Sequence, residues 1–160
     1  MATVFVGIGT NLGDRQANID RALELLKENE DIEIMAVSKI IETEPVDGPP
    51  QGSFLNGILK IKTDLLPLEL LSQLKMVERR LGRVKKEQNG PRTMDLDILF
   101  YDDVVIVDGK SLQIPHPRMH ERSFVLEPLS EIAPDFIHPR LKKSVKALLD
   151  ELLNASSSKS

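Results

Sequence analysis

The order in which strand-like and helix-like segments alternate constrains the fold of this chain more than any other feature. Residues Thr3–Ile8 form a short apolar run rich in β-branched side chains, which predicts a strand. Glycines then interrupt the pattern, and apolar positions between residues 19 and 26 recur at the i, i+4, i+7 spacing of one helix face. A long β-type segment over residues 32–42 follows. The first unit is therefore predicted as strand, helix, strand.

The second unit repeats this order. Phe54–Lys62 alternates as a strand, and a helix is predicted after Asp64, with its apolar face ending before the helix stop Gly82. Residues 94–100 then form another strand. The complete order, βαββαβ, predicts a ferredoxin-like α+β sandwich with the sheet on one side and the helices on the other.

Further elements are predicted after that unit. Residues 104–107 and 112–115 are expected to form short strands, and residues 118–129 and 142–153 to form helices. A length of 160 residues is typical of one domain. We therefore expect a single domain over residues 1–154 and a disordered tail over residues 155–160.

Composition excludes several classes of function. The chain has no cysteine, which excludes disulfides, thiolate nucleophiles and cysteine-ligated zinc. Its net charge of −4 argues against a general nucleic-acid binder. The N-terminus has no basic start before its apolar run, and no stretch approaches the roughly 20 apolar residues of a membrane span. We expect a cytoplasmic protein that acts as a monomer and binds neither nucleic acid nor membrane.

A pair of carboxylates in the run GPRTMDLDILF is the strongest candidate for a metal site. Asp95 and Asp97 are two residues apart on a predicted strand, so both side chains project from one face. We expect Leu96, Ile98 and Phe100 to point the other way, into a core. Hard carboxylate oxygens without soft ligands favour Mg²⁺, which takes one or two protein carboxylates and substrate phosphates. A solvated strand face is the simpler interpretation of the pair taken alone.

A cluster of cations precedes this pair in a chain that is acidic overall. Six lysines and arginines occur between residues 79 and 92. Such a run is usually a charged surface loop. Beside a predicted Mg²⁺ site, it favours a segment that binds a triphosphate, because Arg makes bidentate phosphate contacts and Lys acts as a point charge.

Other residues carry weaker signals. The segment GIGTNLGD matches neither G-x-G-x-x-G nor the Walker A pattern, so a structural turn is the favoured interpretation. Phe54 and Asn56 share a strand face and could contact a flat heterocycle, although spacing alone favours a core ring and an edge amide. His116 in PHP is more often a rigid-turn histidine than a ligand.

Several segments, taken together, resemble one family. They are FVGIGTNLGDR, SKIIETEPV, FLN, GPRTMDLDILF and IPHPRMHERSFVLEPLSEIAP, spread over residues 3–139. They are similar to 6-hydroxymethyl-7,8-dihydropterin pyrophosphokinase, an enzyme of folate biosynthesis. The resemblance implies a ferredoxin-like fold. It also implies transfer of the β,γ-pyrophosphoryl unit of ATP to the pterin hydroxymethyl group, with release of AMP.

The resemblance also implies the roles of individual residues. Two Mg²⁺ ions would be bound by Asp95 and Asp97. The expected catalytic residues are Arg83, Lys85, Arg92, Asp95 and Asp97. The ATP site would include Lys75, Glu78, Lys85, Lys86, Arg92, Ile98, Ser111, Gln113, His116 and Arg122. The pterin pocket would include Thr43, Glu44, Val46, Phe54, Asn56, Asp95 and Phe124, with the two phenylalanines sandwiching the ring.

The implied mechanism is in-line attack at the β-phosphorus, with Lys85, Lys86, Arg92, His116 and Arg122 neutralising the developing charge. Two other functions fit the residues when the resemblance is set aside. One is a different Mg²⁺-dependent phosphotransferase or nucleotide hydrolase that uses the same Asp pair. The other is a non-catalytic ferredoxin-like module that senses a small ligand.

Overall fold

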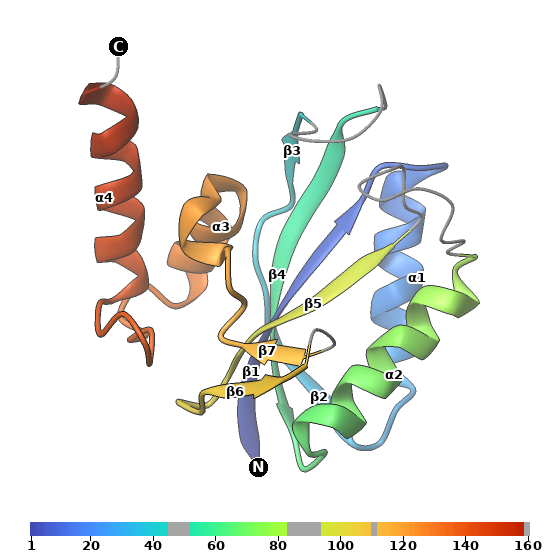
Figure 1. Cartoon of the computed structure of the whole chain (residues 1–160). Helices are drawn as coiled ribbons and strands as arrows, with labels where there is room; N and C mark the ends of the chain where they lie inside the picture. The colour runs from blue at the N-terminus through green and yellow to red at the C-terminus, as the bar shows by residue number, and fades with distance from the viewer. Residues whose placement is uncertain (45–51, 83–93, 110–111, 159–160) are drawn as a thin grey trace.

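The computed structural model describes residues 1–44, 52–82, 94–109 and 112–158. Its centre is an antiparallel sheet in the order β2-β4-β1-β5, with β3 paired to β4 beside β2 (Figure 1). The strands are β1 (Ala2–Thr10), β2 (Ile32–Val37), β3 (Ile41–Thr43), β4 (Phe54–Thr63) and β5 (Asp95–Tyr101). The sheet and its two crossover helices have the predicted ferredoxin-like order.

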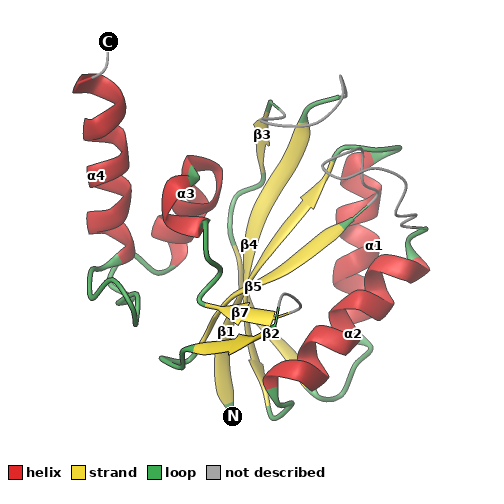
Figure 2. Ribbon diagram, viewed as in Figure 1, coloured by secondary structure: helices red, strands yellow, loops and turns green. Residues whose placement is uncertain are grey.

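Helices lie on both faces of this sheet, which corrects the expectation of a single helical layer. In Figure 2, α1 (Arg15–Lys27) and α2 (Pro67–Arg80) cover one face. The opposite face is partly covered by α3 (Ser123–Ile132), against which α4 (Val145–Ser158) packs. A hairpin of β6 (Ile106–Asp108) and β7 (Leu112–Ile114) and the 3₁₀ helix η1 (Met119–Glu121) connect β5 to α3.

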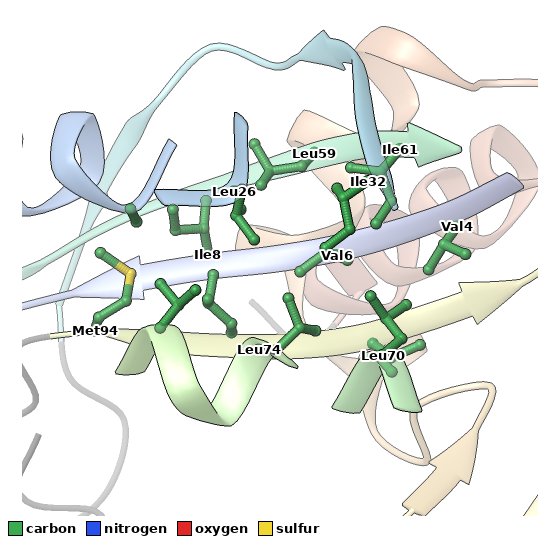
Figure 3. Close-up of a cluster of buried hydrophobic side chains, with 14 of the residues drawn as sticks. Val4, Val6, Ile8, Leu26, Ile32, Leu59, Ile61, Leu70, Leu74 and Met94 are labelled. Atoms are coloured by element: carbon green, nitrogen blue, oxygen red, sulfur yellow. The ribbon is translucent and has the colours of Figure 1, made fainter. Parts of the chain in front are cut away.

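The first core lies between the sheet and the α1–α2 layer. Side chains that alternate along β1 meet the apolar stripes of the two helices at this interface, as Figure 3 shows for Val6, Leu26 and Leu74. Local signals fix where the helices begin and end. The Asp14 side chain caps α1 by accepting from Ala17 N at 3.1 Å, and α2 ends before Gly82, whose φ is +85°.

The second core lies between the opposite face and the α3–α4 layer. It includes Phe5 of β1 and both Leu99 and Phe100 of β5. The register between β1 and β5 shifts between Phe5 and Val6, so alternation along β5 is interrupted at Leu99. The prediction that Phe100 shares a face with Leu96 and Ile98 was therefore wrong, because this irregularity turns Phe100 toward the second core.

Two predicted boundaries in the first half also differ. β1 runs through Gly7 and Gly9 to Thr10, so these glycines belong to the strand and not to a turn. The predicted strand over residues 32–42 is broken after Val37. At the break the Ser38 hydroxyl accepts from Ile58 N at 2.8 Å and donates to Lys39 O at 2.9 Å, which replaces regular pairing.

The C-terminal part differs at its boundaries. The helix expected over residues 118–129 begins at Ser123, and a 3₁₀ turn precedes it. The last helix continues to Ser158, so residues 155–158 are helical where a disordered tail was expected; residues 159–160 lie outside the described part of the chain. Within the described residues, no helix has the length and apolarity needed to cross a membrane.

The turn before α4 depends on a buried histidine. His138 is 3% exposed, and its Nδ1 accepts from the backbone N–H groups of Arg140 and Leu141, both at 3.1 Å. Burial, followed by the charges of His120 and Arg140, lowers the pKa of His138 from 6.5 to about 4. The neutral ring is therefore the form that the fold requires.

We expect acid to weaken the fold through this residue. The lowered pKa of His138 means that the unfolded chain binds the proton first, so its stabilising contribution is complete above pH 6.5 and is lost as the pH falls toward 4. His138→Asn keeps an acceptor but does not titrate. Urea unfolding at pH 7, 6 and 5 should show a shallower loss of stability for this variant than for the wild type. Parallel pH dependences would contradict the assignment.

Candidate active site

The candidate site lies on the sheet face that α3 partly covers, which we call the α3 face. At one end of the sheet, where β1 ends and β4 and β5 begin, Gly9 is paired with Asn56 on one side and Asp95 on the other. Thr43 of β3 is paired with Phe54 of β4. Because directly paired residues of antiparallel strands share a face, the sheet brings these predicted site residues onto one face in two adjacent rows. One row contains Asp95, Gly9 and Asn56, and the other contains Phe54 and Thr43.

Two glycines of β1 leave the middle of this face without side chains. A Cβ on Gly9 would lie 2.9 Å from Asn56 Oδ1, so no larger residue fits beside the carboxamide as it stands. The Asn56 amide is held in turn by donation from Nδ2 to Thr43 Oγ1 at 2.6 Å. Gly7 is paired with Asp97 in the same way. The sequence interpretation missed this feature, because glycines near the end of a strand are also the signal of a turn.

The two aspartates differ from a solvated strand face. Asp97 is half-buried, and its pKa is raised from 3.8 to about 7 by burial, then by the charges of Asp95 and Glu78. Lys75 and Arg122 act in the opposite direction. Ionising both carboxylates in this setting costs free energy that a nearby cation would offset.

A buried glutamate of α2 stands at the edge of the same strand. Glu78 is 1% exposed, and its Oε2 accepts from the backbone N–H of Leu96 at 2.8 Å. Its Oε1 lies 3.4 Å from Lys75 Nζ. Both residues were predicted to line the ATP site, and the structure places them beside the Asp pair through α2.

The histidine of the PHP segment also lies within the electrostatic range of this pair. His116 donates its backbone N–H to Leu99 O at 3.0 Å, and its Nδ1 accepts from Arg118 N at 3.3 Å. Burial and then the Arg122 charge lower the pKa of His116 to about 4. The ring is therefore neutral near pH 7, with its proton on Nε2. His116 was predicted to neutralise developing charge, and with this lowered pKa it would do so as a neutral hydrogen-bond donor.

Arg122 and Phe124 enter from the start of α3. The Arg122 guanidinium lies 5.7 Å from the centroid of the Phe124 ring. Phe124 is half-buried against the second core, and α3 packs against β4 and β3. Phe54 is the first residue of β4. The stacking of a pterin between Phe54 and Phe124 remains a prediction.

The remaining predicted site residues have no described contact with this cluster or lie outside the described part of the chain. The Ile98 side chain is in the first core, on the face opposite the Asp pair. Ile98 could therefore contact ATP only through its backbone. Gln113 lies in β7, paired with Val107, and Glu44 is exposed after β3. The residues outside the described part of the chain are Val46, Arg83, Lys85, Lys86, Arg92 and Ser111.

No group of three or more His, Cys, Asp or Glu residues suited to a metal ion occurs among the described residues. A Mg²⁺ site built from two protein carboxylates and completed by substrate phosphates would not form such a group. The oxygen-only donor set of Asp95 and Asp97 therefore fits a hard divalent cation that binds together with a phosphate substrate.

Comparisons with known proteins define the class and then the family. Residues 5–134 match the family described as 7,8-dihydro-6-hydroxymethylpterin-pyrophosphokinase. The 2-amino-4-hydroxy-6-hydroxymethyldihydropteridine pyrophosphokinase of Aquifex aeolicus is 45% identical over 151 residues, covering 94% of this chain and 92% of the relative. The protein of the same name from Bacillus subtilis is 44% identical over 128 residues, 80% of this chain and 76% of the relative.

Longer proteins match as well. The folic acid synthesis protein fol1 of Schizosaccharomyces pombe is 40% identical over 148 residues, which are 92% of this chain and 20% of that protein. A solved HPPK-DHPS structure in complex with substrates superposes with a TM-score of 0.79 at 16% identity, covering 99% of this chain and 44% of that one. At that identity the superposition shows the fold alone, and the fold is the ferredoxin-like one.

These matches identify a transferase of the kinase class. The chain belongs to the 7,8-dihydro-6-hydroxymethylpterin-pyrophosphokinase family, and its function is pyrophosphoryl transfer to hydroxymethyldihydropterin in folate biosynthesis. Enzymes of this family use ATP as the pyrophosphate donor.

The close approach of Gly9 to Asn56 gives a test of the site. Gly9→Ala places a methyl group 2.9 Å from Asn56 Oδ1, so the carboxamide must shift from its place beside Thr43. We expect the KM for the pterin to rise about tenfold or more, because small misplacements of positioning groups are costly. Steady-state kinetics at saturating ATP measures this.

Gly7→Ala is the comparison variant for the pterin contact, because Gly7 is paired with Asp97 and Ile58 and not with Asn56. The nearest atoms to its Cβ would be side-chain atoms of Leu99 at 3.7–3.8 Å, which is ordinary contact. This variant should retain a KM for the pterin within about twofold of the wild type. If the two alanine variants behaved alike, the close approach of Gly9 to Asn56 would not be what shapes the site.

The raised pKa of Asp97 predicts that this side chain destabilises the metal-free protein. A native pKa above the unfolded value means that stability falls as the pH rises from 3.8 to about 7. With a chelator at pH 8, Asp97→Asn should therefore be more stable than the wild type by about 1–3 kcal/mol. Near pH 4 the two should unfold alike in urea. A variant less stable than the wild type at pH 8 would contradict the assignment.

Proposed function

We propose that this chain transfers the β,γ-pyrophosphoryl group of ATP to 6-hydroxymethyl-7,8-dihydropterin, releasing AMP, with two Mg²⁺ ions held by Asp95 and Asp97. This corresponds to a Mg²⁺-dependent diphosphotransferase. The observation that carries the metal assignment is the pairing of both carboxylates with glycines on one open face, together with the raised pKa of Asp97. A site arranged for fold stability alone would not hold two like charges there.

The bound ions would neutralise phosphate charge and lower the pKa of the substrate hydroxyl. The protein supplies the remaining positioning. Asp95 and Asp97 would provide oxygen ligands. Gly7 and Gly9 have no side chains, so substrate could approach the carboxylates over β1. Glu78 holds the N–H of Leu96, which lies between the two aspartates, and so fixes the strand that carries them.

The ATP phosphates would lie against the cationic side of this cluster. Arg122 and Lys75 already act on the charge of Asp97, which places positive potential beside the carboxylates. His116 would donate from Nε2–H as a neutral group, because Nδ1 is occupied by the Arg118 N–H. The remaining proposed ATP contacts are Glu78, Lys85, Lys86, Arg92, Ile98, Ser111 and Gln113, with Arg83, Lys85 and Arg92 also acting in catalysis.

The pterin would lie over β3 and β4, on the side of Gly9 that carries Asn56. Asn56 presents a carboxamide whose orientation is fixed by Thr43, which suits hydrogen bonds to the edge of a flat heterocycle. Phe54 and Phe124 would contact the ring faces. Glu44 and Val46 would complete the pocket. Asn56 and Asp95 lie on either side of Gly9, so a pterin bound here would have its hydroxymethyl group directed toward the metal site.

We also propose that the chain acts as a monomer in the cytoplasm without nucleic-acid or membrane partners. The net charge of −4 supports the absence of a general nucleic-acid role. Among the described residues, no particular contact favours a nucleotide hydrolase or a ligand sensor.

An AMP-release assay tests the proposed reaction. Purified protein with ATP and Mg²⁺ should release AMP only when 6-hydroxymethyl-7,8-dihydropterin is added, and a chelator should abolish release. Asp97→Ala should lower kcat by about 100-fold or more, because a charge-stabilising ligand is lost. Production of ADP, turnover without pterin, or near-native release by Asp97→Ala would each overturn part of the proposal.

A further inference from the structure

Arg15, at the start of α1, reaches away from its own helix to two other segments. Its Nη1 donates to the backbone oxygen of Ser53 at 2.9 Å, with a longer contact to Ser53 Oγ at 3.4 Å. Its Nη2 lies 3.0 Å from Glu42 Oε2. One guanidinium therefore bridges the residue before β4 and the middle residue of β3.

Both contacted residues are chain neighbours of the pterin pocket. Ser53 directly precedes Phe54, and Glu42 directly precedes Thr43. Thr43 and Phe54 are paired across the two strands, and Thr43 also orients Asn56. A change in the spacing between β3 and β4 at this point would therefore move three proposed pterin contacts together.

The placement of Arg15 conflicts with the preference of its own helix. Arg15 is the first residue of α1, where the positive end of the helix dipole disfavours a cation, and the first turn has no acidic residue. The ion pair is also partly exposed, since the Glu42 side chain is 57% exposed, and such pairs contribute little to stability. Stability of the helix or of the fold is thus a weak reason for an arginine here.

A second contact from the same segment runs parallel to the first. Asn11, which follows β1, donates from Nδ2 to Gly52 O at 3.2 Å. Asn11 and Arg15 therefore donate to two successive carbonyls, those of Gly52 and Ser53, immediately before Phe54. This gives the GTNLGDR sequence a role beyond a strand-to-helix turn.

We infer that Arg15 is a positioning residue for the pterin: its guanidinium sets the separation of β3 and β4 and so places Thr43, Phe54 and Asn56 against the ring. It touches neither the substrate nor the metal ligands. The inference depends on the proposed pterin pocket, and it assigns a specificity role to a side chain outside that pocket.

The test compares Arg15→Gln with Arg21→Gln. Arg21 lies on the same helix and forms an exposed ion pair with Glu24 at 2.9 Å. No hydrogen bond or ion pair joins it to β3 or β4 in the described structure, so it is a matched control. For Arg15→Gln we expect the KM for the pterin to rise about tenfold, with the Kd for ATP within about twofold of the wild type. Arg21→Gln should match the wild type in both.

Two further variants separate positioning from simple structural loss. Glu42→Gln leaves the bond from Arg15 to Ser53 O in place, so it should have a smaller effect than Arg15→Gln. Arg15→Lys keeps the charge but loses the two separate guanidinium nitrogens that contact Ser53 and Glu42. It should therefore retain only part of the wild-type pterin affinity. The melting temperatures of all four variants should stay close to that of the wild type.

Direct binding keeps this result independent of turnover. The chain has no tryptophan and one tyrosine, so the fluorescence of the pterin itself reports its Kd with little protein background. An unchanged pterin Kd in Arg15→Gln, or a loss of ATP and pterin affinity together with a lowered melting temperature, would overturn the inference. If instead the wild type bound pterin but released no AMP, the proposed reaction would fail while the positioning role stood.

Discussion

The pairing of two glycines with two aspartates between β1 and β5 is the constraint on which the site depends. Gly7 opposite Asp97 and Gly9 opposite Asp95 place the carboxylates beside two positions of β1 that have no side chains. The neighbouring strand then supplies Asn56 across the same gap. With a larger residue at position 9, side-chain atoms would separate the Asn56 carboxamide from Asp95, and a flat substrate could not span them.

The sheet can tolerate this opening because its two faces are packed differently. One face is covered by α1 and α2 over a continuous apolar core. On the other, Phe5, Phe100 and the α3–α4 layer form a second core that does not include Asn56, Asp95 or Asp97. The shift in register at Phe5 and Val6 turns an extra large side chain of β5 toward that second core. Stability is thus concentrated away from the residues that must remain accessible.

The sequence predicted the fold and the carboxylates for a physical reason. Periods of 2 and 3.6 report which face of an element is buried, so the βαββαβ order and the shared face of Asp95 and Asp97 could be derived from spacing. The irregularities could not. The break at Ser38 depends on hydroxyl contacts to Ile58 and Lys39, and the orientation of Phe100 depends on pairing with a distant strand.

The glycines illustrate a different failure. Near a strand end, glycine is a signal of a turn, and the local pattern contains nothing to separate that meaning from an open strand face. Only the register with Asn56 and the two aspartates makes the distinction. The contacts of Arg15 were equally invisible, since Glu42 and Ser53 are 27 and 38 residues away.

Locally unfavourable choices gather at the end of β1 that carries the site. Thr10 is fully buried, and its hydroxyl has no hydrogen-bond partner in the described structure, which costs about 1–3 kcal/mol. Asp97 is held where burial and a like charge raise its pKa, and Arg15 begins a helix at its positive end. At the remote turn before α4, by contrast, His138 satisfies two backbone N–H groups. The locally unfavourable residues thus lie together near the site, whereas the remote turn is locally satisfied. This is the pattern expected when a site is selected for binding and chemistry at the expense of stability.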